Sequence, residues 1–169
     1  MTPESSDPTF ASARLRERGR RYDDFEVGHA YRHHWGRTVT EADTLLFATA
    51  TLAYNPLYLN VELAKEEGHP ALVVDPYLVL AIVVGLSVED LSERSEALLG
   101  LEEVEFLEPV YPGDTVTAES VVAGKRPSRS RPATGVVTWS TEGRNQRGRP
   151  VVRLTRSNLF SVVSCDAAE

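Results

Sequence analysis

The stretch from Asp75 to Ser92, DPYLVLAIVVGLSVEDLS, constrains the fold of this chain more than any other. Asp75 is suited to cap a helix and Pro76 to begin it, because proline lacks an N–H that would otherwise be unpaired at that position. No charged residue occurs between Tyr77 and Leu86. The sequence therefore predicts a helix that is apolar on every face and must be enclosed by protein or lipid.

The length of this helix decides what encloses it. About a dozen residues cannot cross a bilayer, which takes ~20, so we expect no membrane contact and predict that the protein's own sheet covers the helix. A buried strand or strand pair is the alternative, since Val and Ile are frequent in this stretch. Its length and its capped start favour the helix.

Two shorter helices are predicted before this stretch. Ahead of them, residues 1–20 show no hydrophobic period and predict a mobile arm. A strand is predicted over 30–39. Thr40, with Asp43 three residues later, predicts the capped start of a helix over 41–52. Asn55 and Pro56 are predicted to end it, because the residue before a proline avoids the helical conformation. A helix over 61–67 then ends at a glycine suited to a left-handed cap.

After the apolar helix the hydrophobic pattern changes to a period of two. It predicts strands over 98–108, 115–123, 135–143 and 151–162, separated by turn residues at 111–114, 128–132 and 146–148. An antiparallel sheet that follows an apolar helix, with strands long enough to curl, should wrap around that helix. The chain is thus predicted to be α+β with the hot-dog fold, as one domain over 21–163 before a short tail at 164–169.

The cysteine and histidine content excludes several kinds of site. The single cysteine, Cys165, rules out a disulfide within the chain and any cysteine-based metal cluster, and it indicates a cytoplasmic protein. His33 and His34 are adjacent on a predicted strand, so their side chains point to opposite faces and cannot bind one metal together. We expect no metal site.

The charge of the chain is unevenly distributed. A formal net charge of −7 argues against nucleic-acid binding, yet residues 125–156 carry a net charge of +8, so the rest carries −15. This region suits a small polyanionic ligand, and solvent-exposed arginines on loops are the alternative. Four side chains are candidates for the phosphates of such a ligand, because Lys and Arg donate charge-assisted hydrogen bonds. They are Lys125, Arg126, Arg129 and Arg131.

Six short motifs in order carry a resemblance to a known family. They are Gly36–Asp43 (GRTVTEAD), Asn55–Leu57 (NPL), Gly85–Asp90 (GLSVED), Pro109–Thr115 (PVYPGDT), Ser128–Pro132 (SRSRP) and Gly143–Gly148 (GRNQRG). With these motifs the chain resembles the MaoC-like acyl-CoA hydratases and dehydratases, and within them the mesaconyl-CoA hydratase (methylmalyl-CoA dehydratase) branch. The resemblance implies a hydro-lyase that adds or removes water across the α,β-double bond of an acyl thioester. Coenzyme A then belongs to the substrate, with no tightly bound cofactor, and an acyl carrier protein is the alternative carrier.

The chain departs from this family at the positions that carry the chemistry. The resemblance implies an Asp and a His around the Asn-Pro pair, and a backbone N–H at the start of the central helix for the thioester oxygen. Here these positions are Ala53, Tyr58 and Pro76. Alanine transfers no proton and proline has no N–H, so the family's mechanism cannot be carried over unchanged.

A rebuilt site can use other residues at the same place. Asp75 could act as the base, or serve only as the helix cap. Tyr58 could donate a hydrogen bond to the thioester oxygen, and the N–H of Tyr77 could replace the donor lost at proline. Tyr54 and Asn55 lie in the same segment, although one tyrosine could instead pack in the core and Asn55 could be a turn residue. His69 could border the site.

Three functions remain open at this point. The first is an acyl-CoA hydratase or dehydratase acting on a short branched or dicarboxylic acyl group. The second is a non-catalytic acyl-binding subunit of a hot-dog hetero-oligomer. The third is a thioesterase, or a pathway-specific elimination or cyclisation enzyme, on the same fold. The open edges of the predicted sheet lead us to expect a homodimer or higher oligomer, or a hot-dog heteromer.

Overall fold

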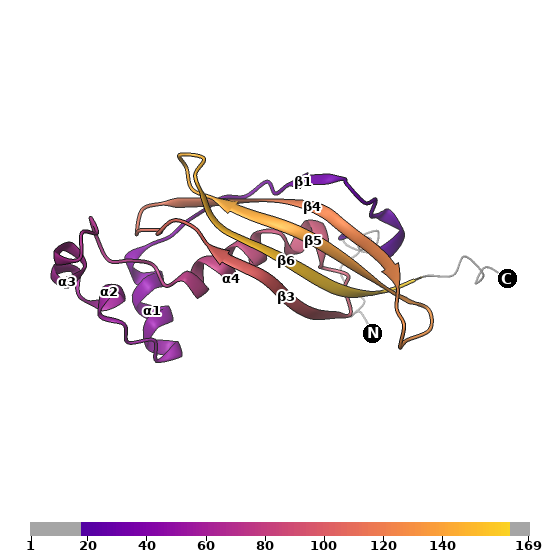
Figure 1. The fold of residues 1–169 in the computed structure, drawn as a ribbon, viewed down its shortest axis with the longest axis horizontal. Helices are drawn as coiled ribbons and strands as arrows, with labels where there is room; N and C mark the ends of the chain where they lie inside the picture. Colours follow the sequence, from indigo (N-terminus) through magenta and orange to yellow (C-terminus); the bar gives the residue numbers. More distant parts are fainter. Residues whose placement is uncertain (1–17, 163–169) are drawn as a thin grey trace, which may run out of the picture.

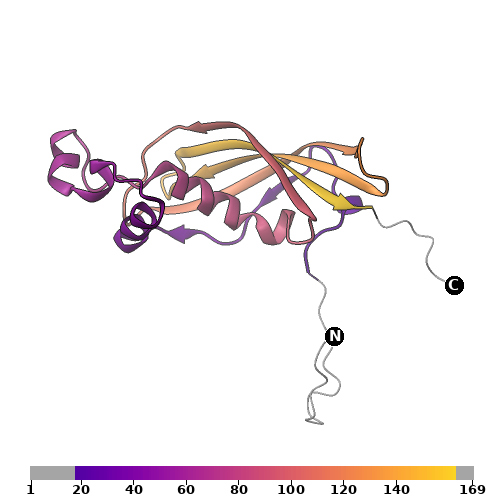
Figure 2. The same cartoon turned by 90° about the horizontal axis from the view of Figure 1, so that it is seen from below.

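The computed structural model describes residues 18–162, and it has the α+β hot-dog fold that the sequence predicts. An antiparallel sheet in the order β1-β4-β5-β6-β3, with the short β2 paired to β4, curls over helix α4 (Figures 1 and 2). The strands are β1 (Ala30–Arg32), β2 (Arg37–Thr38), β3 (Ala97–Phe106), β4 (Thr115–Pro127), β5 (Thr134–Arg144) and β6 (Pro150–Ser161). The helices are η1 (Tyr22–Asp24), α1 (Glu41–Thr51), α2 (Pro56–Leu59), α3 (Val61–Glu66), α4 (Pro76–Leu86) and α5 (Val88–Leu91).

Helix α4 begins as its sequence predicts. The Asp75 side chain accepts the N–H of Tyr77 at 2.8 Å, and Pro76 occupies the first position. One face of the helix packs on valines, an alanine and a leucine of β4 and β6. A Cβ at Gly143 of β5 would overlap the side chain of Val83, so this close approach of helix and sheet requires glycine.

The sheet wraps α4 as predicted but leaves one side of the helix exposed within the described residues. Tyr77 is 66% exposed, and Ala81 and Gly85, which follow at intervals of four residues, are also exposed. The six-stranded sheet covers only one side of the helix (Figure 2). An apolar stripe therefore faces outward along α4. Between residues 18 and 162 no helix is long and apolar enough to span a membrane.

The elements before α4 differ from the prediction in two details. The strand predicted over 30–39 is two strands, β1 and β2, because residues 34–36 leave the pairing with β4. The N–H of His33 still donates to the carbonyl of Ala118 in β4, and its side chain is buried like that of Tyr31. Helix α1 starts with the predicted Thr40 capping box but ends at Leu52, which adopts a left-handed conformation with φ 58°. Asn55 does not end α1; its side chain accepts the N–H of Leu57 and caps α2.

The core consists of two apolar clusters separated by a band of polar residues. One cluster surrounds α4 and the other contains Phe25, Trp139 and Phe160, whose rings meet edge to face. On the inner face of β4, Ser120 lies between the two clusters, and Thr141 pairs with it from β5. The sheet thus buries hydroxyl groups where the two clusters meet.

The predicted arm and tail lie mostly outside the described residues. Arg18 forms an ion pair with Glu89, and the Arg20 guanidinium lies 4.9 Å from the centre of the Tyr31 ring. The last residues of the predicted arm therefore contact the domain. Residues 1–17 and 163–169, including Cys165, lie outside the described range.

Candidate active site at the start of the central helix

Two segments flank the start of α4 and fix the residues around it. The N–H of Val73 donates to the carbonyl of Leu57 at 3.0 Å, and the N–H of Val74 donates to the carbonyl of Val110 at 2.9 Å. Helix α2 on one side and the segment after β3 on the other are thereby tied to the residues just before Asp75. Helices α1–α3 extend beyond this end of the sheet (Figure 1).

This arrangement brings Tyr58 to Asp75. Burial raises the pKa of the Tyr58 phenol, the nearby Asp75 carboxylate raises it further, and a hydrogen bond with the Asn55 side chain opposes both effects. Tyr58 is therefore a neutral hydrogen-bond donor near pH 7. The electrostatic influence of Tyr77 on the same phenol places four of the predicted residues in one group.

The backbone donors of this helix start are already occupied. Asp75 is only 3% exposed, and its Oδ1 accepts the N–H of Tyr77. The N–H groups of Leu78 and Val79 donate to the Asp75 carbonyl at 2.9 and 3.2 Å, and Pro76 has no N–H. A thioester oxygen would gain the Tyr77 N–H only if the Asp75 side chain released it.

The remaining predicted residues lie elsewhere. Tyr54 is 59% exposed and is not among the side chains that act on the Tyr58 phenol. His69 bonds to the hydroxyl of Tyr111 at 3.0 Å, in the turn after β3. The candidate phosphate ligands are on or beside the β4–β5 hairpin, at the opposite end of the sheet from α1–α3 (Figure 1). A single copy of the chain therefore does not bring them to Asp75.

Several of these basic side chains have intramolecular partners. The Lys125 ammonium donates to the carbonyl of Phe25 at 3.1 Å and lies 4.4 Å from the centre of the Tyr22 ring, and Arg126 donates to the carbonyl of Pro127. Arg131 lies 3.9 Å from the Glu96 carboxylate. Further along the basic region, ion pairs with carboxylates engage Arg144, Arg147, Arg149 and Arg153. Much of the basic region thus balances acids within the fold.

An apolar pocket opens beside the start of α4. It has a volume of about 240 Å³ and is lined by Val74 and Pro76, the two neighbours of Asp75, together with Val73, Val79, Phe106, Leu107, Glu108, Pro109, Val110 and Val151. Short acyl chains suit such a lining, because apolar side chains dominate it. A thioester whose acyl chain filled this pocket would lie next to Asp75.

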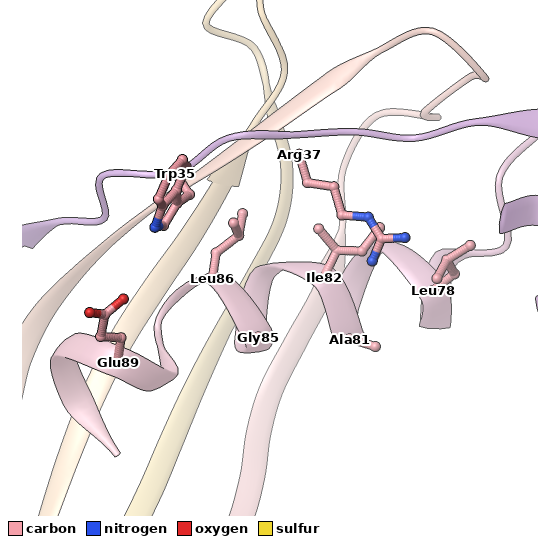
Figure 3. A pocket seen from close by; sticks show the side chains of 8 residues that line it. All are labelled: Trp35, Arg37, Leu78, Ala81, Ile82, Gly85, Leu86 and Glu89. Atoms are coloured by element: carbon pink, nitrogen blue, oxygen red, sulfur yellow. The ribbon is translucent and has the colours of Figure 1, made fainter. Parts of the chain in front are cut away.

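A second, larger hollow runs along the other flank of α4. This groove of about 340 Å³ follows the helix from Leu78 to Leu86 (Figure 3). Trp35, from the segment that joins β1 to β2, and Arg37, the first residue of β2, lie beside it, and Glu89 lies at one end. Arg37 is bound to Asp43 at 2.6 Å, so its charge is already balanced.

Sequence reasoning missed a buried hydrogen-bonded chain near the other end of α4. His33 Nδ1 lies 2.8 Å from Asp90 Oδ2, and His33 Nε2 lies 2.9 Å from Ser120 Oγ, which in turn lies 2.8 Å from Thr141 Oγ1. Burial lowers the pKa of His33, and the bond to Asp90 opposes that effect. No local pattern signals this chain, since 57 residues separate His33 from Asp90.

A buried arginine continues this polar band. The Arg156 guanidinium lies 5.4 Å from the centre of the Trp139 ring, and burial lowers its pKa to about 10, so it stays charged at neutral pH. Its Nε and Nη2 have no hydrogen-bond partner among residues 18–162. Within the same residues no three His, Cys, Asp or Glu side chains are grouped to hold a metal ion.

Comparisons with known proteins agree on one family. The model of the family described as mesaconyl-CoA hydratase matches residues 2–167. The mesaconyl-CoA hydratase of Haloarcula hispanica is 35% identical over 158 residues, which cover 93% of this chain and 44% of that protein. The beta-methylmalyl-CoA dehydratase of Chloroflexus aurantiacus is 33% identical over 138 residues, covering 82% of this chain and 39% of that protein.

Solved structures of related proteins are also similar to this chain. A putative MaoC domain protein dehydratase from Chloroflexus aurantiacus superimposes with a TM-score of 0.82 at 31% identity, covering 89% of this chain and 42% of that one. The monoamine oxidase regulatory protein of Archaeoglobus fulgidus has a TM-score of 0.77 at 31% identity, with 87% and 98% covered. The chain spans less than half the length of the curated relatives it matches.

Proposed function

The chain belongs to the mesaconyl-CoA hydratase family, and from this premise we propose that it binds a short acyl thioester of coenzyme A at the start of α4 and adds or removes water across the α,β-double bond. The observation that carries the proposal is the convergence of Tyr58 with Asp75 beside an apolar pocket. The names of the relatives point to mesaconyl- and methylmalyl-CoA, so both compounds belong among the test substrates.

The proposed mechanism assigns proton transfer to Asp75. Its carboxylate removes a proton from water as the water oxygen bonds to the β-carbon, and returns the proton to the α-carbon. The carboxylate ends the cycle ionised, as it began. Tyr58 donates a hydrogen bond to the thioester oxygen, which gains negative charge during the reaction. A neutral phenol suits this role, because a raised pKa keeps its proton in place.

Coenzyme A enters this proposal as part of the substrate, and the cytoplasm is the compartment that we propose. The basic side chains Lys125, Arg126, Arg129 and Arg131 are remote from Asp75 of the same copy (Figure 1). Their proposed role in holding the phosphates of coenzyme A therefore requires a second hot-dog unit, whose site they approach. An acyl carrier protein is the alternative carrier of the acyl group.

The proposed second unit would cover the exposed apolar stripe of α4. Tyr77, Ala81, Gly85 and Val88 leave this stripe open, and Leu98 and Leu99 are exposed on the edge strand β3. We propose a homodimer or higher oligomer, or a pair with a different hot-dog chain. Light scattering of the purified protein distinguishes these assemblies from a monomer.

The direct test is an assay of the purified protein against crotonyl-, itaconyl-, mesaconyl- and methylmalyl-CoA, with mass detection of hydrated or dehydrated product and of free coenzyme A. Water addition or loss that falls sharply in Tyr58→Phe supports the proposal. Tyr54→Phe is the matched control, since that residue is exposed and is not among the groups that act on the Tyr58 phenol. Equal activity in both variants would contradict the role of Tyr58, and release of free coenzyme A would indicate a thioesterase.

A second candidate function is a non-catalytic acyl-binding subunit. It is favoured by Ala53, Tyr58 and Pro76 at the family's three catalytic positions and by the occupied N–H groups of the first turn of α4. In that case the protein alone is inactive on every thioester but still binds them. Activity then appears on addition of a hot-dog chain that carries the Asp and the His.

A further inference from the structure

The polar band of the core contains a positive charge that no acid contacts within the described residues. Arg156 is 2% exposed, and its guanidinium forms no ion pair there. Burial lowers its pKa to about 10, so it stays charged at neutral pH, and this charge in turn lowers the pKa of His33. The carboxylate of the band, Asp90, is bound by His33 Nδ1 at 2.8 Å. A buried charge without an opposite charge is strongly destabilising, so a counter-ion beside Arg156 would stabilise the fold.

Three N–H donors without a partner among residues 18–162 belong to Arg156 and its neighbour Trp139. They are Nε and Nη2 of the arginine and Nε1 of the indole, and all three are buried. Trp139 of β5 lies directly opposite Arg156 of β6, and the guanidinium carbon is 5.4 Å from the centre of the indole ring. Nε and Nη2 share one edge of the planar guanidinium, so both can donate to a single acceptor. The indole N–H also only donates, so the pair of side chains suits an acceptor.

A water molecule is the alternative occupant, because one acceptor nearby is also unpaired. Asn158 lies two residues after Arg156 on the same face of β6. Its Oδ1 has no partner in the described part of the chain, whereas its Nδ2 donates to Ser95 Oγ at 2.9 Å. A water could accept from the guanidinium and donate to this oxygen. Water carries no charge, however, whereas an anion accepts the same hydrogen bonds and supplies the missing charge.

We propose that Arg156 and Trp139 form a binding site for one small monovalent anion, of the size of chloride, on the inner face of the sheet. Nε and Nη2 of Arg156 hold the anion side-on, and the indole N–H adds a third donor. One guanidinium supplies one positive charge, which a monovalent anion neutralises and a divalent phosphate or sulfate exceeds. Both side chains are almost fully enclosed, which excludes a bulky anion. This inference does not depend on the proposed acyl-CoA site at the start of α4.

Bromide tests the site, because it resembles chloride and quenches the fluorescence of a tryptophan that it contacts. The chain has two tryptophans, and Trp35 is 65% exposed, so Trp35→Phe leaves the buried Trp139 as the only fluorophore. This full-length variant is titrated with sodium bromide at a constant ionic strength set with sodium sulfate. Fluorescence should fall along a saturating curve with a midpoint between about 1 and 100 mM, and chloride should reverse the quenching.

Two further variants in the same background decide whether the arginine holds the ion. Arg156→Met removes the charge and the donors but keeps an apolar chain, so the quenching should become weak and linear. Arg153→Met is the control, because Arg153 is exposed and binds the Glu142 carboxylate at 2.6 Å, so saturation should persist. Saturable quenching that survives Arg156→Met, or linear quenching in every variant, would overturn the inference. Circular dichroism of each variant confirms that it is folded.

A crystal of the wild-type protein grown in sodium bromide gives a second measurement that needs no substitution. The anomalous signal of bromide should show a peak beside Nε and Nη2 of Arg156. A water at that place, with no anomalous signal, would refute the anion site and assign the donors to hydration.

Discussion

The two ends of α4 use similar groups for different purposes. At the start, the Asp75 carboxylate lies near the Tyr58 phenol and beside an apolar pocket. Just past the end, the Asp90 carboxylate binds His33, whose side chain is fully buried and continues into Ser120 and Thr141. A carboxylate and a titratable partner are present at both ends. The apolar pocket lined by both neighbours of Asp75, rather than the residue types, makes the start the candidate for chemistry. The fully buried His33 makes the other end a part of the core.

This difference predicts that substitutions at the two ends of α4 have different effects. The buried chain past the end of α4 places each polar atom against a partner, so removing one member leaves a desolvated donor or acceptor. The group at the start contains an exposed Asn55 and a partly buried Tyr58, which can exchange a protein partner for water or substrate. Substitutions at the start should therefore change activity, and substitutions past the end should change stability.

The largest effect is expected from Asp75→Asn. Asparagine caps helices about as well as aspartate, so the free energy of unfolding should barely change. An amide cannot accept the proton from water, so the proposed hydration should fall by about 10²-fold or more. Urea unfolding and the enoyl-CoA assay on the same preparation separate the two roles. Unchanged activity would show that Asp75 serves only as the cap.

The next effect is expected from His33→Ala past the end of α4. It deletes a buried ring, removes the His33 partner of Asp90 and leaves Ser120 bound to Thr141 alone. A loss of about 2–4 kcal/mol in the free energy of unfolding follows from the cavity and the unpaired groups together. His34→Ala is the control, since that side chain is about half exposed. The activity of the folded fraction should be retained; its loss would place His33 in the chemistry instead.

The pH dependence of stability should also arise at the buried end. Desolvation lowers the pKa of His33, the charges of Arg156 and His34 lower it further, and only Asp90 opposes them. The unfolded chain therefore binds a proton more readily, and stability should fall as the pH drops below about 6.5, by at most ~1.4 kcal/mol per pH unit from this group. Urea midpoints at pH 7.5 and 5.5 measure the effect. A decline of the same size in His33→Gln would assign it to other groups.

The features that the sequence predicts are those set by neighbours in the chain. The cap at Asp75, the Thr40 capping box and the period-two strands depend on residues a few positions apart, and each is present. The left-handed Leu52 was missed because nothing in its residue type favours that conformation. The partners of the buried His33 side chain, Asp90 and Ser120, could not be predicted, because only the folded sheet brings them to it.

The candidate site also has a part that the sequence predicts and a part that only the folded chain reveals. The place of Tyr58 near Asp75 could be predicted, because the family resemblance puts both segments at the start of the helix. The place of Glu108 in the lining of the pocket could not be predicted, because it depends on how the segment after β3 lies against α4. Local patterns locate the site, and tertiary packing decides what it can bind.

The smallest effect is expected in the titration of Tyr58. It tests directly whether Tyr58 and Asp75 interact at the start of α4. Burial and the Asp75 charge raise the pKa of Tyr58. Removing that charge in Asp75→Asn should lower the pKa of Tyr58, while the effect of burial remains. Carbon NMR of labelled tyrosines between pH 8 and 12 follows each phenol, and Tyr58→Phe assigns its signal. Tyr22 is the internal control, because burial and Asp23, rather than Asp75, raise its pKa. An unchanged Tyr58 titration would separate the phenol from the carboxylate and remove the basis for placing both in one site.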